Sequence, residues 1–218
     1  MLDATEEPAA RTRVLNGVAV PGTGFDEARD LHPAHENTVV SALRRHVRRG
    51  DSVVVVGGGW GTTTVVAARM THFEGHVTAF EPSPKMLDVL ERTVHANRVT
   101  DVVSVRHAAV GSVSDSSERI FGHGDVEVVS PAELPDCDVL DVDCEGAELE
   151  ILEGLDGRPR LLTVEVHPHL GCSQEAVETQ LLRLGYDVVN REPIEPDSDI
   201  VNLVALHDSD GAAEPSDG

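Results

Sequence analysis

A run of four valines followed by a glycine-rich turn constrains the fold of this chain more than any other feature. Val53–Val56 is a continuous β-branched segment, and Gly57-Gly58-Gly59-Trp60-Gly61 follows it directly. Such a run is typical of a strand buried on both faces of a parallel sheet. The residues after the turn, Thr62 to Met70, fit a helix. The sequence therefore predicts a strand, a tight turn where backbone can approach a ligand, and a helix N-terminus beside it.

An acidic residue about twenty positions further along favours a nucleoside site at this turn. A second predicted strand, His76 to Phe80, ends in Glu81, whose carboxylate could accept hydrogen bonds from both hydroxyls of a ribose. Thr62 stands where the dinucleotide pattern G-x-G-x-x-G needs glycine or alanine, and no Gly-Lys-Ser/Thr follows for a P-loop. The turn instead has the G-x-G-x-G pattern of S-adenosylmethionine sites, with a turn that binds nothing as the alternative.

Strand and helix patterns alternate along most of the chain, which favours a parallel sheet covered by helices. The last two strand candidates have only a Pro-, Asp- and Glu-rich loop between them, so we expect them to pair antiparallel. Short strands are also expected over 14–20 and 126–129. The predicted sheet strands are 52–56, 76–80, 102–107, 138–142, 161–166, 186–190 and 200–206, and the predicted helices are 36–47, 61–71, 84–96, 147–154 and 173–184.

The predicted fold is thus α/β and Rossmann-like, with a mostly parallel seven-stranded sheet, helices on both faces and a C-terminal antiparallel hairpin. At 218 residues the chain fits one domain, for which we expect the range 14–207. Residues 1–13 are expected to be flexible, and the acidic tail 208–218 to be disordered.

The charge of the chain is strongly acidic, with 39 acidic and 17 basic residues and a formal net charge of −22. Lys85 is the only lysine, and aromatic residues make up 3%. An acidic, lysine-poor surface suits molar salt, where the Debye length falls to about 3 Å and self-repulsion fades. The composition therefore favours a halophilic source, such as an archaeon. High salt also weakens repulsion from phosphates, so the charge alone does not exclude a nucleic-acid partner. Such a partner is unlikely because a basic patch with aromatic residues is missing.

No apolar stretch approaches the roughly 20 residues that span a membrane, and the acidic N-terminus lacks the apolar region of a secretory signal. The three cysteines form no C-x-x-C pair, which favours a reducing compartment. We therefore expect a cytoplasmic protein without a membrane span.

One segment carries a specific resemblance. Residues 139–152, Val-Leu-Asp-Val-Asp-Cys-Glu-Gly-Ala-Glu-Leu-Glu-Ile-Leu, resemble the most distinctive stretch of the FkbM-type methyltransferases, usually Lys-Ile-Asp-x-Glu-Gly-Ala-Glu followed by apolar residues. Further pieces follow in the family's order, namely Glu81-Pro82, Asn97, Ala109-Val110-Gly111 and Val164-Glu165-Val166-His167. The resemblance covers residues 35–206 and implies methyl transfer from S-adenosylmethionine, typically to an oxygen of a small molecule, sugar or glycolipid.

Two features depart from the family's pattern. In the glycine turn, Val55 stands where an acid is usual and Gly58-Gly59 stand where Ala-Asn is usual, which puts one contact to the methionine half of the cofactor in doubt. Asp141 stands where lysine is usual. A non-catalytic nucleoside-binding module of the same fold therefore remains one alternative, and an RNA or protein methyltransferase is another. A homodimer is compatible with the sequence.

The expected cofactor contacts come from the glycine turn and from the ends of the neighbouring strands: Gly57, Gly58, Gly59, Gly61, Glu81, Pro82, Ala109 and Asp143. Asp143, just past a strand, is the first candidate for placing the acceptor or the methyl end of the cofactor. His167 is the candidate general base, because an imidazole can accept a hydroxyl proton near neutral pH.

Some of these residues have a second interpretation. Glu145 could act in catalysis or could cap the helix that begins near Gly146. Glu148 and Glu150 are expected on a solvated helix face. The His167-Pro-His169 run could ligate a metal together with Asp143, but the proline is expected to end the strand and spoil that geometry, so no metal site is predicted.

Overall fold

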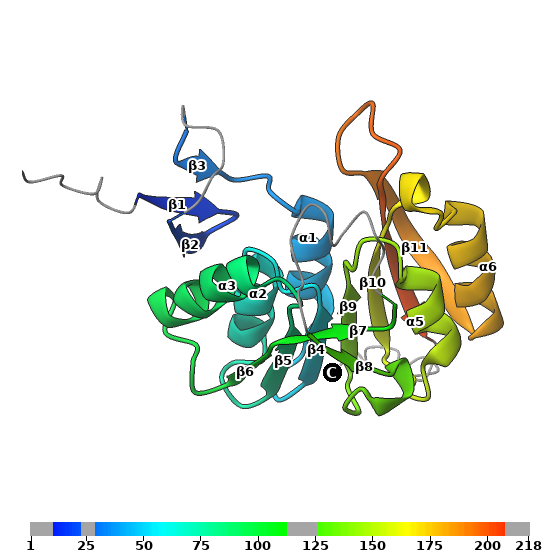
Figure 1. Ribbon diagram of the computed structural model, residues 1–218, viewed down its shortest axis with the longest axis horizontal. Helices are drawn as coiled ribbons and strands as arrows, with labels where there is room; N and C mark the ends of the chain where they lie inside the picture. The colour runs from blue at the N-terminus through cyan, green and yellow to red at the C-terminus, as the bar shows by residue number, and fades with distance from the viewer. Residues whose placement is uncertain (1–10, 23–28, 113–125, 208–218) are drawn as a thin grey trace, which may run out of the picture.

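A seven-stranded sheet forms the centre of the computed structural model, which describes residues 11–22, 29–112 and 126–207. The strand order is β11-β12-β10-β9-β4-β5-β6 (Figure 1). Neighbours are parallel except at β12, which is antiparallel to both β10 and β11. The predicted fold class is therefore confirmed. The strands are β4 (Ser52–Val56), β5 (His76–Phe80), β6 (Val103–Arg106), β9 (Val139–Val142), β10 (Leu161–Val166), β11 (Tyr186–Pro193) and β12 (Val201–His207).

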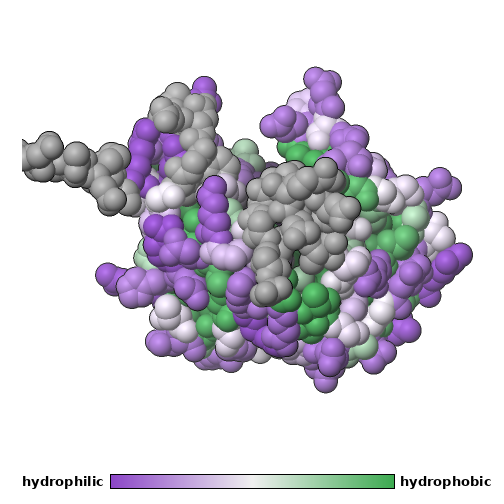
Figure 2. All heavy atoms as spheres, viewed as in Figure 1, coloured by the Kyte–Doolittle hydropathy of each residue, from purple (hydrophilic) through white to green (hydrophobic). Residues whose placement is uncertain are grey.

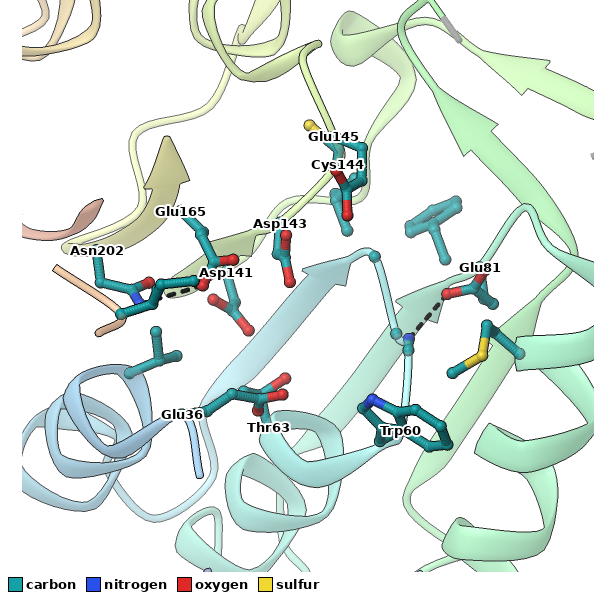
Figure 3. Close-up of a pocket in the computed structure, with 18 of the residues that line it drawn as sticks. Glu36, Trp60, Thr63, Glu81, Asp141, Asp143, Cys144, Glu145, Glu165 and Asn202 are labelled. Atoms are coloured by element: carbon teal, nitrogen blue, oxygen red, sulfur yellow. Dashed lines mark hydrogen bonds between the residues drawn. The ribbon is translucent and has the colours of Figure 1, made fainter. Parts of the chain in front are cut away.

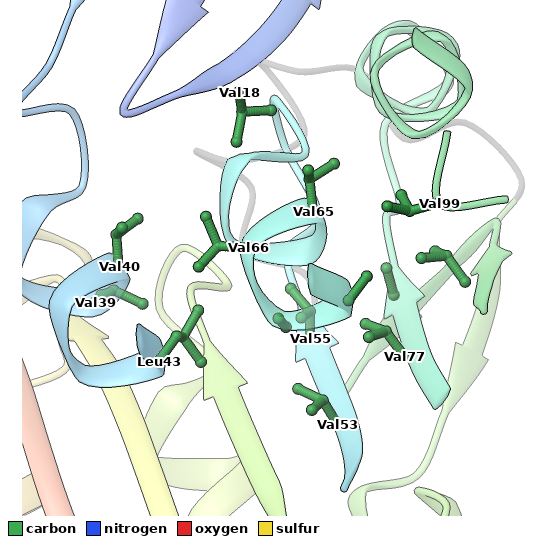
Figure 4. Packing of buried hydrophobic residues seen from close by; sticks show 14 of the residues in the cluster. Val18, Val39, Val40, Leu43, Val53, Val55, Val65, Val66, Val77 and Val99 are labelled. Atoms are coloured by element: carbon green, nitrogen blue, oxygen red, sulfur yellow. The ribbon is translucent and has the colours of Figure 1, made fainter. Parts of the chain in front are cut away.

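Helices cover both faces of the sheet, as the valine-rich strands require. Val53 and Val55 of β4 belong to one buried cluster and Val54 and Val56 to the other, because successive strand residues point to opposite faces. Figure 4 shows the first cluster, in which valines of the strands meet those of the helices. The first face is covered by α1 (Asn37–His46), α2 (Thr62–Met70) and α3 (Pro84–Ala96), and the second by α5 (Glu148–Gly154) and α6 (Gln174–Arg183).

A small sheet near the N-terminus differs from the prediction of one strand over 14–20. The segment is a hairpin of β1 (Thr12–Leu15) and β2 (Val18–Pro21), and β3 (Leu31–His32) pairs parallel with β1. Asn16 (φ 46°) and Gly17 (φ 85°) both adopt the left-handed conformation of a two-residue hairpin turn, and Asn-Gly is a preferred pair there. β1 also begins inside the segment expected to be flexible, most of which lies outside the described residues, as does the tail 208–218.

The segment after β6 contains a strand that the sequence did not reveal. β7 (Ala108–Val110) pairs parallel with β8 (Glu127–Val129), which confirms a strand close to the predicted 126–129. Short 3₁₀ turns, η1 (Pro131–Glu133) and η2 (Pro168–Leu170), begin at prolines. β11 runs further than the predicted 186–190: its pairing with β12 continues to Pro193, with a register shift between Val188 and Asn190.

The side of the surface drawn in Figure 2 is largely hydrophilic where the residues are described, in keeping with the acidic composition. Within the described ranges, no helix has both the length and the apolar character that crossing a membrane requires.

Candidate active site

A pocket of about 630 Å³ opens at the carboxyl edge of the sheet, where β4, β5, β9 and β10 end. Crevices at this edge are the usual ligand sites of open α/β sheets, and the volume is typical of small-molecule sites. Figure 3 shows that the glycine turn separates two groups of side chains: Glu81 lies on one side, and Asp141, Asp143 and Glu165 lie on the other. We call these the glycine half and the acidic half of the pocket.

Gly57 forms the sharp exit from β4 and cannot carry a side chain. Its φ is +90°, and a Cβ there would lie 1.7 Å from the backbone oxygen of Asp143. The amide nitrogens of Gly57 and Gly58 both donate to the carbonyl of Phe80, at 2.9 Å each. The turn is therefore fixed between the ends of β5 and β9, and it brings both strand ends to the pocket.

Gly59 differs from Gly57 because it faces open space. Its φ is +48°, and a Cβ would approach nothing closer than 3.9 Å. A side chain at this position would therefore extend into the space beside the turn. Gly61 follows as the N-cap residue of α2, and Gly57, Gly58 and Gly59 all line the pocket.

Glu81 is buried and held by two backbone amides. Its Oε2 accepts from the Gly59 nitrogen and its Oε1 from the Ser83 nitrogen, both at 2.8 Å. Burial raises the pKa of Glu81, and these two hydrogen bonds oppose that shift. Each carboxylate oxygen keeps a further lone pair for a ligand. Pro82 and Ala109, two other expected cofactor contacts, also line the pocket.

The acidic half contains far more negative charge than its surroundings neutralise. Asp143 is half-buried and lines the pocket together with Glu145, Glu165 and Glu36. Enclosure by the protein, and then the charge of Glu165, raise the pKa of Asp143 well above its usual range. The lining residues that the structure describes include eight acids and no lysine or arginine. The acidic half is therefore suited to a neutral or cationic ligand.

His167 lies behind these carboxylates rather than in the pocket lining. It is 2% exposed, and its Nδ1 is 2.6 Å from Oε1 of Glu148. Burial alone would lower the pKa of His167, but the hydrogen bond with Glu148, the carboxylate of Glu165 at 3.5 Å and the charges of Asp143 and Glu145 raise it to about 11. A protonated imidazole cannot accept a proton. The general-base role stays a prediction, and these surroundings disfavour it.

Two expectations for the segment after β9 are corrected. Glu148 is not on a solvated face but fully buried, because α5 turns this residue inward against His167. Glu145 does not cap the helix: its φ is +56°, and the Gly146 nitrogen donates to Oε1 of Glu148 at 3.0 Å instead. Glu145 remains a pocket residue, so its catalytic role stays a prediction. Glu150 is exposed, as expected.

The pocket also contains residues that the sequence did not single out. Glu36, Glu192 and Asn202 come from the start of α1, the end of β11 and the start of β12. Asn202 interrupts an apolar strand segment and could have been noticed for that reason. Glu36 and Glu192 lie in polar surroundings, and their sequence gives no signal of a site.

A family comparison identifies the chain. The family model described as the methyltransferase FkbM domain matches residues 46–188, well over half of the sequence. The chain belongs to the FkbM methyltransferase family. It is thus an S-adenosylmethionine-dependent methyltransferase by family, and the pocket lies where the glycine turn and Glu81 were expected to hold that cofactor. A search of curated protein sequences found no match.

Solved structures with the same fold carry names that point to different partners. A SAM-dependent O-methyltransferase from Thermotoga maritima is 16% identical, with 84% of this chain and 68% of that chain covered and a TM-score of 0.52. A ribosomal protein L11 methylase from Lactobacillus delbrueckii subsp. bulgaricus is 14% identical, with 85% and 91% covered and a TM-score of 0.53. The structure of aTrm5 with tRNALeu is 10% identical, with 93% and 54% covered and a TM-score of 0.58. At these identities the likeness shows the fold alone, so nucleic acid is not excluded as the acceptor of this FkbM methyltransferase.

Val55 and Asp141, which both depart from the usual FkbM pattern, are neighbours in space. Val55 of β4 and Asp141 of β9 are partners in the parallel register, so an acid and a lysine at these positions would face each other. Here Val55 is fully buried in the core, and Asp141 lines the pocket. Burial raises the pKa of Asp141 to about 7, although hydrogen bonds with Thr163 and Thr63 act in the opposite direction. At position 141 this chain therefore has an acid in the acidic half where the family usually has a lysine.

Proposed function

We propose that this FkbM methyltransferase transfers a methyl group to a hydroxyl oxygen of a small, uncharged acceptor such as a sugar or another polyol. The observation that carries the proposal is the charge of the pocket, whose described lining residues include eight acids and no lysine or arginine. A polyanion such as RNA would meet electrostatic repulsion there. A volume of about 630 Å³ suits the cofactor with a small acceptor better than a macromolecular surface.

The proposed cofactor position is the glycine half. Glu81 would accept from the ribose hydroxyls with the lone pairs that the Gly59 and Ser83 amides leave free. The open face of Gly59 would let the cofactor approach the backbone of the turn. Pro82 and Ala109 would line the same half. The methyl group would then point towards Asp143 and the acidic half.

The proposed reaction is an in-line displacement. A lone pair of the acceptor oxygen forms a bond to the methyl carbon while the electrons of the carbon–sulfur bond return to sulfur, which becomes a neutral thioether. The hydroxyl proton leaves to a carboxylate of the acidic half. Asp143 and Glu145 would hold the acceptor in line with the methyl group, because orientation alone supplies a large part of such a rate enhancement. His167 would act from behind, by holding these carboxylates in place.

The test uses purified full-length protein and S-adenosylmethionine labelled in its methyl group. We expect label to enter neutral sugars or polyols, and transfer to fall strongly in Glu81→Ala, with Glu91→Ala on the exposed side of α3 as the control. Label that enters tRNA or protein instead would contradict the proposed acceptor. Tight cofactor binding without transfer to any acceptor would instead favour the non-catalytic binding module.

A further inference from the structure

Three metal-ligating side chains meet at the back of the acidic half. One carboxylate oxygen each of Asp143 and Glu165 and a ring nitrogen of His167 all lie within 4.8 Å of one another. Asp143 follows β9, and Glu165 and His167 come from the end of β10, so the parallel pairing of these strands brings the three together. His169 takes no part: it is exposed, and its ring centroid lies 5.9 Å from that of His167.

Two of the three side chains, His167 and Glu165, have a neighbour that fixes their orientation. Nδ1 of His167 is 2.6 Å from the buried carboxylate of Glu148, which leaves Nε2 facing the acidic half. The side-chain amide of Asn202 donates to Oε2 of Glu165 at 3.1 Å, as Figure 3 shows. A carboxylate or amide behind a ligand is the usual way in which proteins fix the tautomer and direction of a metal-binding histidine.

The distances at Nε2 of His167 suit a shared cation better than direct hydrogen bonds. Nε2 lies 3.5 Å from Glu165, 3.6 Å from Glu145 and 3.8 Å from Asp143. Charge-assisted hydrogen bonds are shorter, at about 2.7–2.9 Å. Two ligands that each lie about 2.1 Å from one ion at a tetrahedral angle are roughly 3.4 Å apart. The three carboxylates therefore lie 3.5–3.8 Å from Nε2, close to the spacing between two ligands of a tetrahedral ion.

A second observation comes from Asn202. This residue is 3% exposed, and its amide faces Glu165 (Figure 3). Its Oδ1 finds no hydrogen-bond partner among the residues that the structure describes. A buried amide oxygen without a partner costs free energy, and an ion or an ion-bound water beside Glu165 would satisfy it.

We propose that Asp143, Glu165 and His167 bind a divalent transition-metal ion, with Glu145 beside them, at the acceptor end of the pocket. The mixture of carboxylate oxygens and one imidazole nitrogen suits Mn²⁺, Co²⁺ or Zn²⁺. The ion would balance part of the charge of the acidic half. Its effect on the reaction rests on the proposed function: an acceptor oxygen bound to the ion would be held near the methyl group and would lose its proton more easily.

The first experiment measures Mn²⁺ binding to full-length protein by titration, with the loss of the free-ion paramagnetic resonance signal as the readout. We expect one tight site per chain. Glu165→Gln and Asp143→Asn, which preserve side-chain shape, should each weaken it by about tenfold or more. Glu91→Gln, an exposed acid of α3, is the matched control and should bind as the unchanged protein does.

Surface carboxylates could also bind Mn²⁺, so a second readout has to report on the histidine itself. We expect spin-echo modulation from one imidazole nitrogen in the Mn²⁺ complex, and its loss in Glu165→Gln. The proposal would be overturned by any of three results: no Mn²⁺ binding, binding without a nitrogen signal, or equal binding by both variants and the control. In each case Nε2 of His167 would carry a proton rather than a metal ion. Because these readouts do not involve methyl transfer, failure to methylate a polyol would contradict the proposed function but not the metal site.

Discussion

The two halves of the pocket satisfy their charges in different ways. In the glycine half, the buried carboxylate of Glu81 accepts hydrogen bonds from the backbone amides of Gly59 and Ser83. In the acidic half, Asp141, Asp143 and Glu165 lie close together (Figure 3), and the imidazole of His167 lies beside Asp143 and Glu165. The carboxylate of the glycine half is thus stabilised by the protein itself. The negative charge of the acidic half needs a ligand or a cation to balance it.

This difference reflects how each half is built. The glycine half comes from a contiguous turn and from the end of the next strand, so a local pattern determines it. The acidic half brings together residues from α1, β9, β10, β11 and β12, which meet only in the folded protein. A cofactor common to a family suits the first kind of construction, and an acceptor that varies between relatives suits the second.

The largest effect is expected from a change to Glu148, the buried carboxylate that contacts His167 behind the acidic half. Glu148→Ala should lower the free energy of unfolding by about 3–5 kcal/mol, because it removes the buried carboxylate that lies 2.6 Å from Nδ1 of His167 and leaves that nitrogen without its partner. Denaturant unfolding measures this change. Glu153→Ala, at an exposed site on the same helix, should stay within about 0.5 kcal/mol of the unchanged protein. Equal losses in both variants would show that His167 does not depend on Glu148.

The next effect concerns the glycine half. Glu81→Ala should weaken S-adenosylmethionine binding by about 1–3 kcal/mol, since two ribose hydroxyls would lose a charged acceptor. Isothermal titration calorimetry measures the affinity. Glu165→Gln, in the acidic half, serves as the comparison and should change cofactor affinity much less. If the two variants had the same effect, the division of the pocket into two halves would be wrong.

A smaller loss is expected when the open face of the turn is filled. Gly59→Asn should reduce cofactor affinity by about tenfold, because asparagine tolerates a positive φ but its side chain would occupy the space beside the turn. Gly50→Asn is the matched control, with φ +82° and nothing within 4 Å of the added Cβ. Calorimetry should find this control unchanged. Equal affinity in the Gly59 variant would place the cofactor away from the turn.

The smallest expected effect is on thermal stability, and it distinguishes the charge of the acidic half from the charge of the whole surface. Self-repulsion of the net charge of −22 should lower the melting temperature in dilute buffer, and molar potassium chloride should restore it. A change of 1 kcal/mol corresponds to about 2–4 °C for a chain of this size. Glu165→Gln should keep the salt effect if it belongs to the whole surface. A flat melting temperature would contradict the halophilic source expected from the composition.

The sequence predicted the sheet, its antiparallel end and the glycine half, because these follow from patterns within short segments. The hairpin at Asn16-Gly17 and the strand β7 were missed, since each depends on a turn or a partner that periodicity does not reveal. In the acidic half, Asp143 and Glu165 were visible at strand ends. The sequence did not show that Glu148 is buried, because this depends on which face of α5 lies towards His167 at the end of β10.

His167 shows why a residue type does not determine a role. The sequence placed an imidazole at the end of a strand, where a general base would stand, but could not place the carboxylates around it. Glu148, Asp143 and Glu145 come from the segment that follows another strand. Burial lowers the pKa of His167, but the contacts with Glu148 and Glu165 and the charges of Asp143 and Glu145 raise it to about 11. Ionisation depends on such neighbours, and they become visible only in the folded protein.

A crystal structure with S-adenosylhomocysteine tests the central claim, that the two halves hold cofactor and acceptor respectively. We expect the ribose hydroxyls on Glu81, the nucleoside beside Gly57–Gly59, and the sulfur directed towards Asp143, with the acidic half left open for the acceptor. A nucleoside bound among Asp143, Glu165 and Glu36, with Glu81 free of contact, would contradict the account.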